Sequence, residues 1–310
     1  MTRKLTIGTR GSKLALWQSN HVASLLTERF GVEVELLHIK TLGDKILDVP
    51  LAKIGDKGLF VKELEVALLE GKVDLAVHSM KDVPTELPGA LGITAILERA
   101  DARDSLISKD NKRLADLPLG TRVGTSSLRR KAQLLVHRPD LELVDVRGNL
   151  ETRLRKMEEG QFEAIILASA GLDRMGYDNL ITERLSSEIS LSAVGQGAIG
   201  IETRLDDDTV NAMVTALSHQ PTYTAVLAER GLLRRLEGGC QIPIGAFAQL
   251  SGSRLSLDGL VAALDGKRLF RDSIEGDAAD AEELGVRLAE KLIAAGADKI
   301  LAEIRAENDS

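Results

Sequence analysis

The chain has 310 residues, of which 44% are hydrophobic and 28% charged, a balance typical of a globular protein with two or three domains. Its net charge of −7 and pI near 5.4 argue against nucleic acid as a partner, because phosphate binding needs a basic surface. One cysteine excludes an internal disulfide and a cysteine-based metal cluster, and no apolar run approaches the roughly 20 residues of a membrane-spanning helix. We therefore expect a cytoplasmic protein with no bound metal, no membrane partner and no nucleic-acid partner.

The first half of the chain alternates short strands with helices. The loop TRGS (9–12) leads into an amphipathic helix that ends at Gly31. We expect strands over 5–8, 32–39 and 73–77, a second helix over 59–71 and an inserted loop over 41–58.

The second half repeats this order. We expect strands over 122–125, 141–146 and 162–168 and helices over 128–137 and 150–160. Local sequence agrees, since IGT (7–9) matches VGT (123–125) and GKVDLAVHS (71–79) matches GQFEAIILAS (160–169). The repeat predicts a duplication with a parallel, doubly wound sheet in each half, and ligand binding at the carboxyl ends of the strands.

After residue 220 the pattern changes. We expect a helix over 224–238, strands over 244–250, 254–264 and 267–276 with turns at 251–253 and 265–266, and a helix near 280–295. The stretch 190–205 contains three glycines and is typical of a return crossover between the first two domains.

The predicted fold class is α/β, with two duplicated doubly wound lobes resembling type II periplasmic binding proteins. A small C-terminal α+β domain with an antiparallel three-stranded sheet follows. We expect domain 1 over 1–98 plus 198–217, domain 2 over 99–197 and domain 3 over 218–310.

Cations and hydroxyl groups gather at the predicted junctions between strands and helices. They are Arg10 and Ser12 in the first half, and Thr125, Ser126, Ser127, Arg129, Arg130, Arg147, Arg153 and Arg155 in the second. Helix N-termini offer unpaired N–H groups, and arginine binds carboxylate or phosphate in a bidentate manner, so these junctions predict anion sites. Solvation or pairing with glutamate explains Arg155 equally well, and Lys53 and Lys57 form either a basic lid or a solvated loop.

The segment VHSMKDVP (77–84) places Asp82 at the carboxyl end of a predicted buried strand. A carboxylate there, partly desolvated and beside a cation, suits proton transfer or the stabilisation of positive charge. An Asp that accepts hydrogen bonds in a turn is the alternative. Side chains alternate between the two faces of a strand, so His78 is as easily a histidine packed in the core as a catalytic residue.

The only cysteine, Cys240, lies in RLEGGCQIPIGAF (235–247), between a Gly-Gly pair and a turn. An isolated cysteine is usually a small buried hydrophobic residue, but these neighbours predict a loop. A loop thiol serves as a nucleophile or as a covalent anchor. No histidine lies nearby in the sequence as a base, so we favour the anchor.

Together these segments resemble the porphobilinogen deaminase family over essentially the whole chain. The matching motifs are GTRGSKLALWQ, GDKGLFVKELEVALLEGKVDLAVHSMKDVPTELP, GTSSLRRKAQL, RGNLETRL, ISLSAVGQGAIGIE and LEGGCQIPIGAF. The resemblance implies a transferase that adds four porphobilinogen molecules in turn to a dipyrromethane cofactor, each with loss of ammonia. Hydrolysis then releases the linear tetrapyrrole hydroxymethylbilane, and the dipyrromethane stays bound to Cys240 through a thioether.

The resemblance also implies roles for individual residues. Asp82 is the catalytic residue, which hydrogen-bonds pyrrole N–H groups. Cofactor contacts fall to Cys240, Arg10, Ser12, Lys81, Asp82, Thr125, Ser127, Arg129, Arg130, Arg147, Gly148, Arg153 and Gln196. Substrate contacts fall to Arg10, Arg147, Arg153, Lys57, Phe60 and Arg174. The expected partner is the small molecule porphobilinogen, and the expected state is a monomer.

Two other functions also fit part of the pattern. Two duplicated α/β lobes are typical of a solute-binding protein or of the effector domain of a regulator, and fold does not decide function. A thiol hydrolase or transferase without a prosthetic group would instead leave Cys240 free to react with alkylating agents.

Overall fold

The structure is a computed structural model that describes residues 4–45, 58–236 and 242–308. Two of the predicted site residues, Lys57 and Cys240, lie outside the described residues. The described chain forms two compact units. Unit 1 comprises 4–45, 58–100 and 198–223, and unit 2 comprises 101–197, 224–236 and 242–308.

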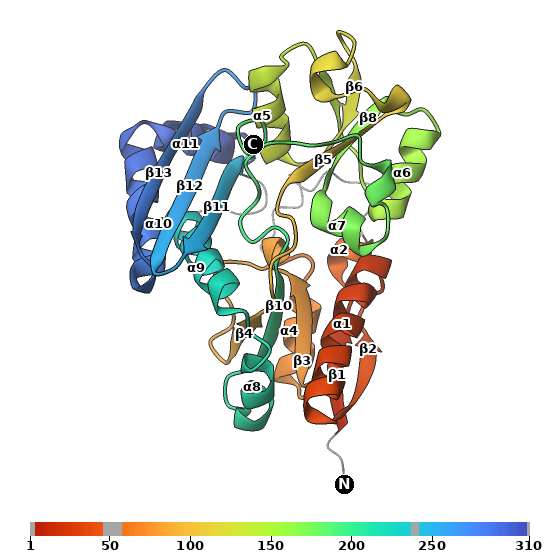
Figure 1. The fold of residues 1–310 in the computed structure, drawn as a ribbon, viewed down its shortest axis with the longest axis vertical. Helices are drawn as coiled ribbons and strands as arrows, with labels where there is room; N and C mark the ends of the chain where they lie inside the picture. Colours follow the sequence, from red (N-terminus) through yellow and green to blue (C-terminus); the bar gives the residue numbers. More distant parts are fainter. Residues whose placement is uncertain (1–3, 46–57, 237–241, 309–310) are drawn as a thin grey trace. The chain divides into compact units, whose positions relative to one another are not determined.

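Unit 1 is built on a five-stranded mixed sheet (Figure 1). Its strands, in spatial order, are β2 (Glu33–His38), β1 (Lys4–Thr9), β3 (Leu75–Ser79), β10 (Ile199–Arg204) and β4 (Leu91–Ile96). Strand β1 pairs parallel with β2 and β3, whereas β10 pairs antiparallel with β3 and β4. Residues 199–204 therefore supply an interior strand to a sheet whose other strands lie before residue 97.

Helices cover both faces of this sheet. They are α1 (Lys13–Phe30), α4 (Lys62–Leu69) and α8 (Asp208–Thr215), with a short helix α2 (Leu42–Lys45). Apolar residues of α1 and α8 pack with Leu75 and Val77 on one face, and those of α4 pack with Ala76 on the other. Successive side chains of a strand point to opposite faces, which is why the apolar run of β3 is buried on both sides.

Unit 2 contains a second mixed sheet of five strands. In spatial order these are β7 (Glu142–Val144), β6 (Arg122–Gly124), β8 (Ala164–Ala168), β5 (Asp104–Ser108) and β9 (Glu183–Arg184). The helices α5 (Leu128–His137), α6 (Leu150–Glu158) and α7 (Ser169–Arg174) follow β6, β7 and β8. The parallel triplet β7-β6-β8 reproduces the triplet β2-β1-β3 of unit 1, as the repeat in the sequence predicts.

The expectation of two wholly parallel sheets is wrong. Strand β5 runs antiparallel to β8 and β9, just as β10 runs antiparallel to its neighbours in unit 1. Only a crossover that carries a helix forces the next strand of the sheet to be parallel. Strands β5 and β10 each enter where the chain passes from one unit to the other, without such a helix, and so the opposite direction is open to them.

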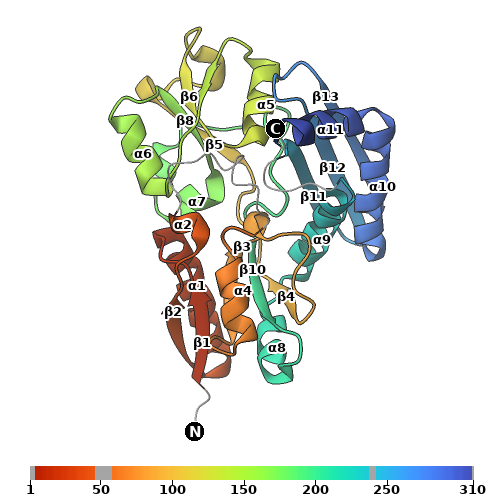
Figure 2. The same cartoon turned by 180° about the vertical axis from the view of Figure 1, so that it is seen from behind.

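The rest of unit 2 holds the three-stranded sheet. Strands β11 (Ile244–Ser251), β12 (Arg254–Ala262) and β13 (Leu269–Asp277) are antiparallel neighbours, which confirms the prediction. Helices α9 (Gln220–Arg235), α10 (Ala281–Ala294) and α11 (Ala297–Asn308) contribute to its core, and Figure 2 shows α10 and α11 against one face of the sheet. Helix α11 is not part of the sequence-based prediction.

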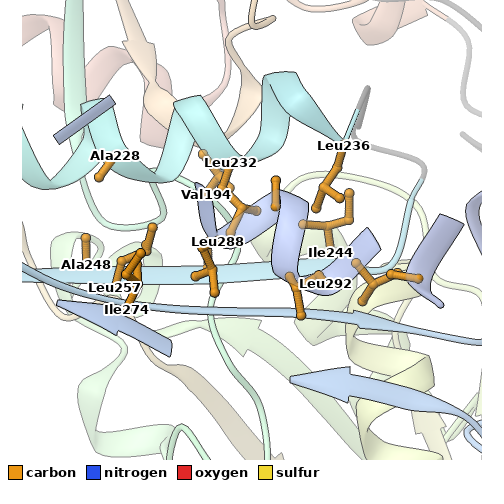
Figure 3. Packing of buried hydrophobic residues seen from close by; sticks show 14 of the residues in the cluster. Val194, Ala228, Leu232, Leu236, Ile244, Ala248, Leu257, Ile274, Leu288 and Leu292 are labelled. Carbon is orange, nitrogen blue, oxygen red and sulfur yellow. The ribbon is translucent and has the colours of Figure 1, made fainter. Parts of the chain in front are cut away.

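The core of this region is aliphatic. Figure 3 shows Leu232 and Leu236 of α9 above the strands, with Leu288 and Leu292 of α10 packed among them. All four side chains are buried. None of the helices in the described part of the chain is long and apolar enough to cross a membrane.

Candidate active site

A pocket opens in unit 1 where β1 and β3 end. Because these strands are parallel neighbours, their carboxyl ends meet at one edge of the sheet. The pocket has a volume of about 420 Å³, including the part that is open to solvent. Four predicted site residues line it, namely Arg10, Ser12, Phe60 and Asp82.

Each of these residues lies at or close to the end of a helix, a strand or a turn. Ser12 caps α1, and its Oγ accepts a hydrogen bond from the backbone N–H of Ala15 at 3.3 Å. The Arg10 guanidinium lies over the Phe60 ring, 4.2 Å from its centroid, which holds the cation at the pocket wall by a cation–π contact. Asp82 ends a short 3₁₀ turn, Met80–Asp82, directly after β3. Lys81 belongs to the same turn and is not among the pocket-lining residues.

Three further polar residues of the pocket, Gln18, His78 and Ser79, are not among the predicted site residues. Gln18 of α1 is 2% exposed, and its Nε2 donates to Ser79 Oγ at 2.8 Å. His78 is 5% exposed and contacts the buried Glu202. Sequence alone gives weak signals for Gln18 and His78, because a single glutamine in an amphipathic helix or a histidine in a strand is usually a packing residue.

Unit 2 holds a second cluster, which is centred on Asp104 at the start of β5. Asp104 is fully buried. Its Oδ2 lies 2.8 Å from Arg129, and its Oδ1 accepts from Arg130 at 2.7 Å and from Gln196 Nε2 at 2.9 Å. The hydroxyl of Ser190 donates to Oδ2 at 2.7 Å. Three predicted cofactor-binding residues thus meet on one carboxylate that the sequence analysis did not single out.

The charges of this cluster do not balance. It contains two guanidinium groups and one carboxylate, all buried, and therefore one excess positive charge. Burial alone would raise the pKa of Asp104, but Arg129 and Arg130 outweigh it and hold that pKa well below its usual range. Burial lowers the pKa of Arg129, whereas Asp104 acts in the opposite direction. A buried excess cation is stabilised by an anion, so this cluster is suited to a carboxylate ligand.

The acid dependence of stability follows from Asp104. Its pKa is about 3.9 in an unfolded chain and lower in the folded protein. At pH values above the unfolded pKa both states are ionised and the stabilisation is fully present. It is lost as the pH falls through the folded pKa, because the unfolded chain takes up a proton first.

We expect urea unfolding of the wild type to lose more free energy between about pH 5 and pH 2 than unfolding of Asp104→Asn, because the variant lacks this ionisation. The measurement is the free energy of unfolding at a series of pH values, for both proteins, in the same buffer. Equal slopes for the two proteins would contradict the assignment.

The other predicted residues of unit 2 lie at strand-to-helix junctions. Thr125 follows β6 and is buried, and Ser127 caps α5, its Oγ accepting from the Arg130 N–H at 3.4 Å. Arg153 lies in α6, and its Nε donates to the carbonyl of Gly148, in the loop before that helix, at 2.8 Å. Lys156 Nζ donates to the carbonyl of Arg147 at 3.2 Å.

Gly148 has a backbone reason to be glycine. Its φ is 118°, and a Cβ at this position would lie 2.6 Å from Thr152 Cγ2. The Arg147-Gly148 bend is therefore held by residues of α6 on one side and by the requirement for glycine on the other.

Arg174 ends α7 and is not part of the Asp104 cluster. Its Nη2 donates to the Gly197 carbonyl at 2.7 Å, and burial lowers its pKa to about 10. Among the described residues there is no group of three or more His, Cys, Asp or Glu side chains arranged to hold a metal ion.

Comparisons with known proteins match nearly the whole chain. The family profile "Porphobilinogen deaminase, dipyromethane cofactor binding domain" matches residues 5–212, and "Porphobilinogen deaminase, C-terminal domain" matches 223–294. The porphobilinogen deaminases of Geobacter metallireducens and Geobacter sulfurreducens are each 56% identical to the chain, over 303 and 302 residues. These alignments cover 97% of the chain and 95% of each relative.

Among solved structures, the methionine-binding protein MetQ is similar to the chain at 14% identity, with a TM-score of 0.42. The match covers 72% of this chain and 90% of MetQ. A likeness of that degree decides nothing about function, and the fold rests on the strand order given above.

Proposed function

The chain belongs to the porphobilinogen deaminase family, and from this premise we propose which of its residues carry out the family's reaction. The enzyme is a hydroxymethylbilane synthase, a transferase of tetrapyrrole biosynthesis that uses a dipyrromethane cofactor. The observation that carries our assignment is the pocket of unit 1, which both Asp82 and Arg10 line.

In this proposal Asp82 is the catalytic residue. A carboxylate in that pocket accepts hydrogen bonds from pyrrole N–H groups and stabilises the positive charge that develops on the ring as ammonia leaves. Arg10 binds a carboxylate of the substrate, and its contact with Phe60 keeps its guanidinium oriented. Phe60, which lines the same pocket, is another proposed substrate contact, and so is Lys57, which lies outside the described residues.

The cations of unit 2 hold the acidic groups of cofactor and product. Each pyrrole unit carries an acetate and a propionate, so the growing chain is a polyanion that an acidic protein must bind with a local cluster of cations. The excess positive charge around Asp104 fits such a group. The proposed cofactor contacts are Ser12 and Lys81 in unit 1, and Thr125, Ser127, Arg129, Arg130, Arg147, Gly148, Arg153 and Gln196 in unit 2. Arg147, Arg153 and Arg174 are proposed contacts of the substrate.

We propose that Cys240 anchors the dipyrromethane as a thioether. When bound, the cofactor supplies the terminal ring to which substrate units are added. The support for the anchor is that the family has a dipyrromethane cofactor and that the only cysteine lies within LEGGCQIPIGAF, in the range that matches the family's C-terminal domain.

The intact mass of the denatured, purified protein tests this anchor. We expect an excess over the sequence mass equal to one dipyrromethane, which peptide mapping places on Cys240. Cys240→Ala, purified in the same way, should have the bare sequence mass and gain nothing from porphobilinogen. If the wild type shows the bare mass, gains no adduct with porphobilinogen and releases no ammonia, a solute-binding protein becomes the better explanation.

We propose three domains with boundaries at 1–98 plus 198–217, 99–197 and 218–310. The division is supported by three separate sheets, two of them within unit 2. We also propose a monomer that acts on porphobilinogen in the cytoplasm, which light scattering of the purified enzyme and cell fractionation test.

A further inference from the structure

His78, which lines the pocket, forms a buried pair with Glu202. Strands β3 and β10 are antiparallel, with His78 opposite Gly200, so His78 and Glu202 are diagonal neighbours on one face of the sheet. His78 Nε2 lies 2.9 Å from Glu202 Oε2, and Glu202 is fully buried. The other oxygen of Glu202 has no hydrogen-bond partner among the described residues.

This contact determines which nitrogen of His78 carries the proton. An ionised carboxylate only accepts hydrogen bonds, so Nε2 must donate to Glu202, and the neutral ring keeps its lone pair on Nδ1. The described residues provide no hydrogen-bond partner for Nδ1, and His78 lines the same pocket as Arg10 and Asp82. A buried carboxylate that orients an imidazole and leaves its second nitrogen open is the arrangement of a general base.

Several charged groups lie around the His78 ring. Besides Glu202 on β10, Glu65 of α4 lies close enough that burial and the charge of Glu202 raise its pKa, whereas His78 and Lys62 lower it. Asp82 and Arg10 contribute one charge of each sign from the pocket. Three carboxylates and a single arginine therefore face His78 from the elements packed around it, with Lys62 next to Glu65.

We propose that His78 accepts, at Nδ1, the proton that each condensation releases, and that Glu202 is the positioning residue that holds the ring in its Nε2–H form. This inference rests on the proposed function of the pocket. In each condensation a C–N bond breaks as ammonia leaves, and a new C–C bond forms to the free ring carbon of the growing chain. The C–H bond at that carbon then breaks, its electron pair restores the aromatic ring, and the proton forms an N–H bond at Nδ1. The imidazolium returns the proton to water before the next addition.

Glutamine at position 78 separates this role from packing. Its amide reaches about as far as Nε2 and can still donate to Glu202, but it has no basic atom in place of Nδ1. We expect His78→Gln to assemble the cofactor, as intact mass shows, while kcat falls about 10²-fold or more and KM changes little. The control is His219→Gln, because His219 Nδ1 contacts Thr222 and His219 does not line the pocket. That variant should keep wild-type kcat.

Two measurements exclude a merely structural role. The first is ¹⁵N NMR of the holoenzyme labelled at its five histidines, which should show His78 in the Nε2–H form when neutral. The second is the pH profile of Glu202→Gln. Loss of the buried charge disfavours the imidazolium, so the acid limb of kcat should move to lower pH.

An Nδ1–H form in the wild type, or wild-type kcat in His78→Gln, would overturn the inference even if the enzyme releases ammonia normally. A wild-type protein that binds no cofactor and releases no ammonia would instead contradict the proposed function. If His78→Gln does not fold, the NMR spectrum and the Glu202→Gln profile still decide the question.

Discussion

Asp104→Ala should lower the free energy of unfolding by about 3–5 kcal/mol, the range typical of breaking a buried ion pair by removing one partner. The carboxylate is fully buried and accepts from both Arg129 and Arg130. Without it, two guanidinium groups remain buried with no carboxylate between them, and the Arg130 side chain keeps only its hydrogen bond to the Ile166 carbonyl among the described residues. Most of the lost free energy of unfolding comes from the uncompensated buried charge, and less of it from the lost hydrogen bonds.

Urea unfolding of the holoenzyme and of the variant measures this loss. A matched control is Asp145→Ala, which removes an exposed carboxylate that pairs with Lys131 at 2.9 Å and should cost less than about 1 kcal/mol. The apolar variant Asp104→Leu with Arg129→Met and Arg130→Met should recover most of the lost stability, because no charge is then left unpaired. It should nevertheless fail to assemble the cofactor. Cofactor assembly in that variant would contradict the anion-binding role of the two arginines.

Asp82→Asn should retain the cofactor but condense substrate about 10²–10⁴-fold more slowly than the wild type. The amide has almost the same shape as the carboxylate, so packing in the Met80–Asp82 turn is preserved. It lacks the negative charge that stabilises a cationic ring, and its NH₂ group donates where pyrrole N–H groups need an acceptor. The effect should therefore appear in kcat, not in the stability of the fold.

Ammonia release in single-turnover experiments measures this rate, and intact mass confirms that the cofactor is present. Glu86→Gln is the control, because Glu86 is an exposed carboxylate four residues away that does not line the pocket. It should turn over at the wild-type rate. Near-normal turnover of Asp82→Asn would remove Asp82 from the reaction.

The C-terminal sheet was predictable because its signals are local. Turn residues at 251–253 and 265–266 separate three runs of strand-forming residues, and the observed strands differ from the prediction by two residues or fewer at each end. The direction of β5 and β10 was not predictable in this way. The direction of a strand depends on the end of the sheet at which the chain enters it, and the residues of the strand itself do not indicate that end.

The candidate site also has a part that local sequence predicts and a part that it does not. That Arg10, Ser12 and Asp82 lie close together was predictable, because the carboxyl ends of parallel strands converge whatever the details of packing. The role of Asp104 was not predictable. An aspartate before an apolar run has the same local sequence whether it lies in a turn or binds two arginines. The buried contacts of Asp104 are made with residues at least 25 positions away.

The position of β10 also sets the order in which the protein can fold on the ribosome. Strands β3 and β4 emerge early, but the strand that belongs between them follows only after about another hundred residues of the chain. At typical rates of about 5–20 residues per second, the nascent chain waits several seconds with two unpaired sheet edges. The five-stranded sheet of unit 2 is complete by residue 184, and none of its strands is delayed in this way. Although β1 precedes every strand of unit 2 in the chain, the sheet of unit 1 is thus the later of the two α/β sheets to close, and its unfinished edges are where a chaperone would be needed.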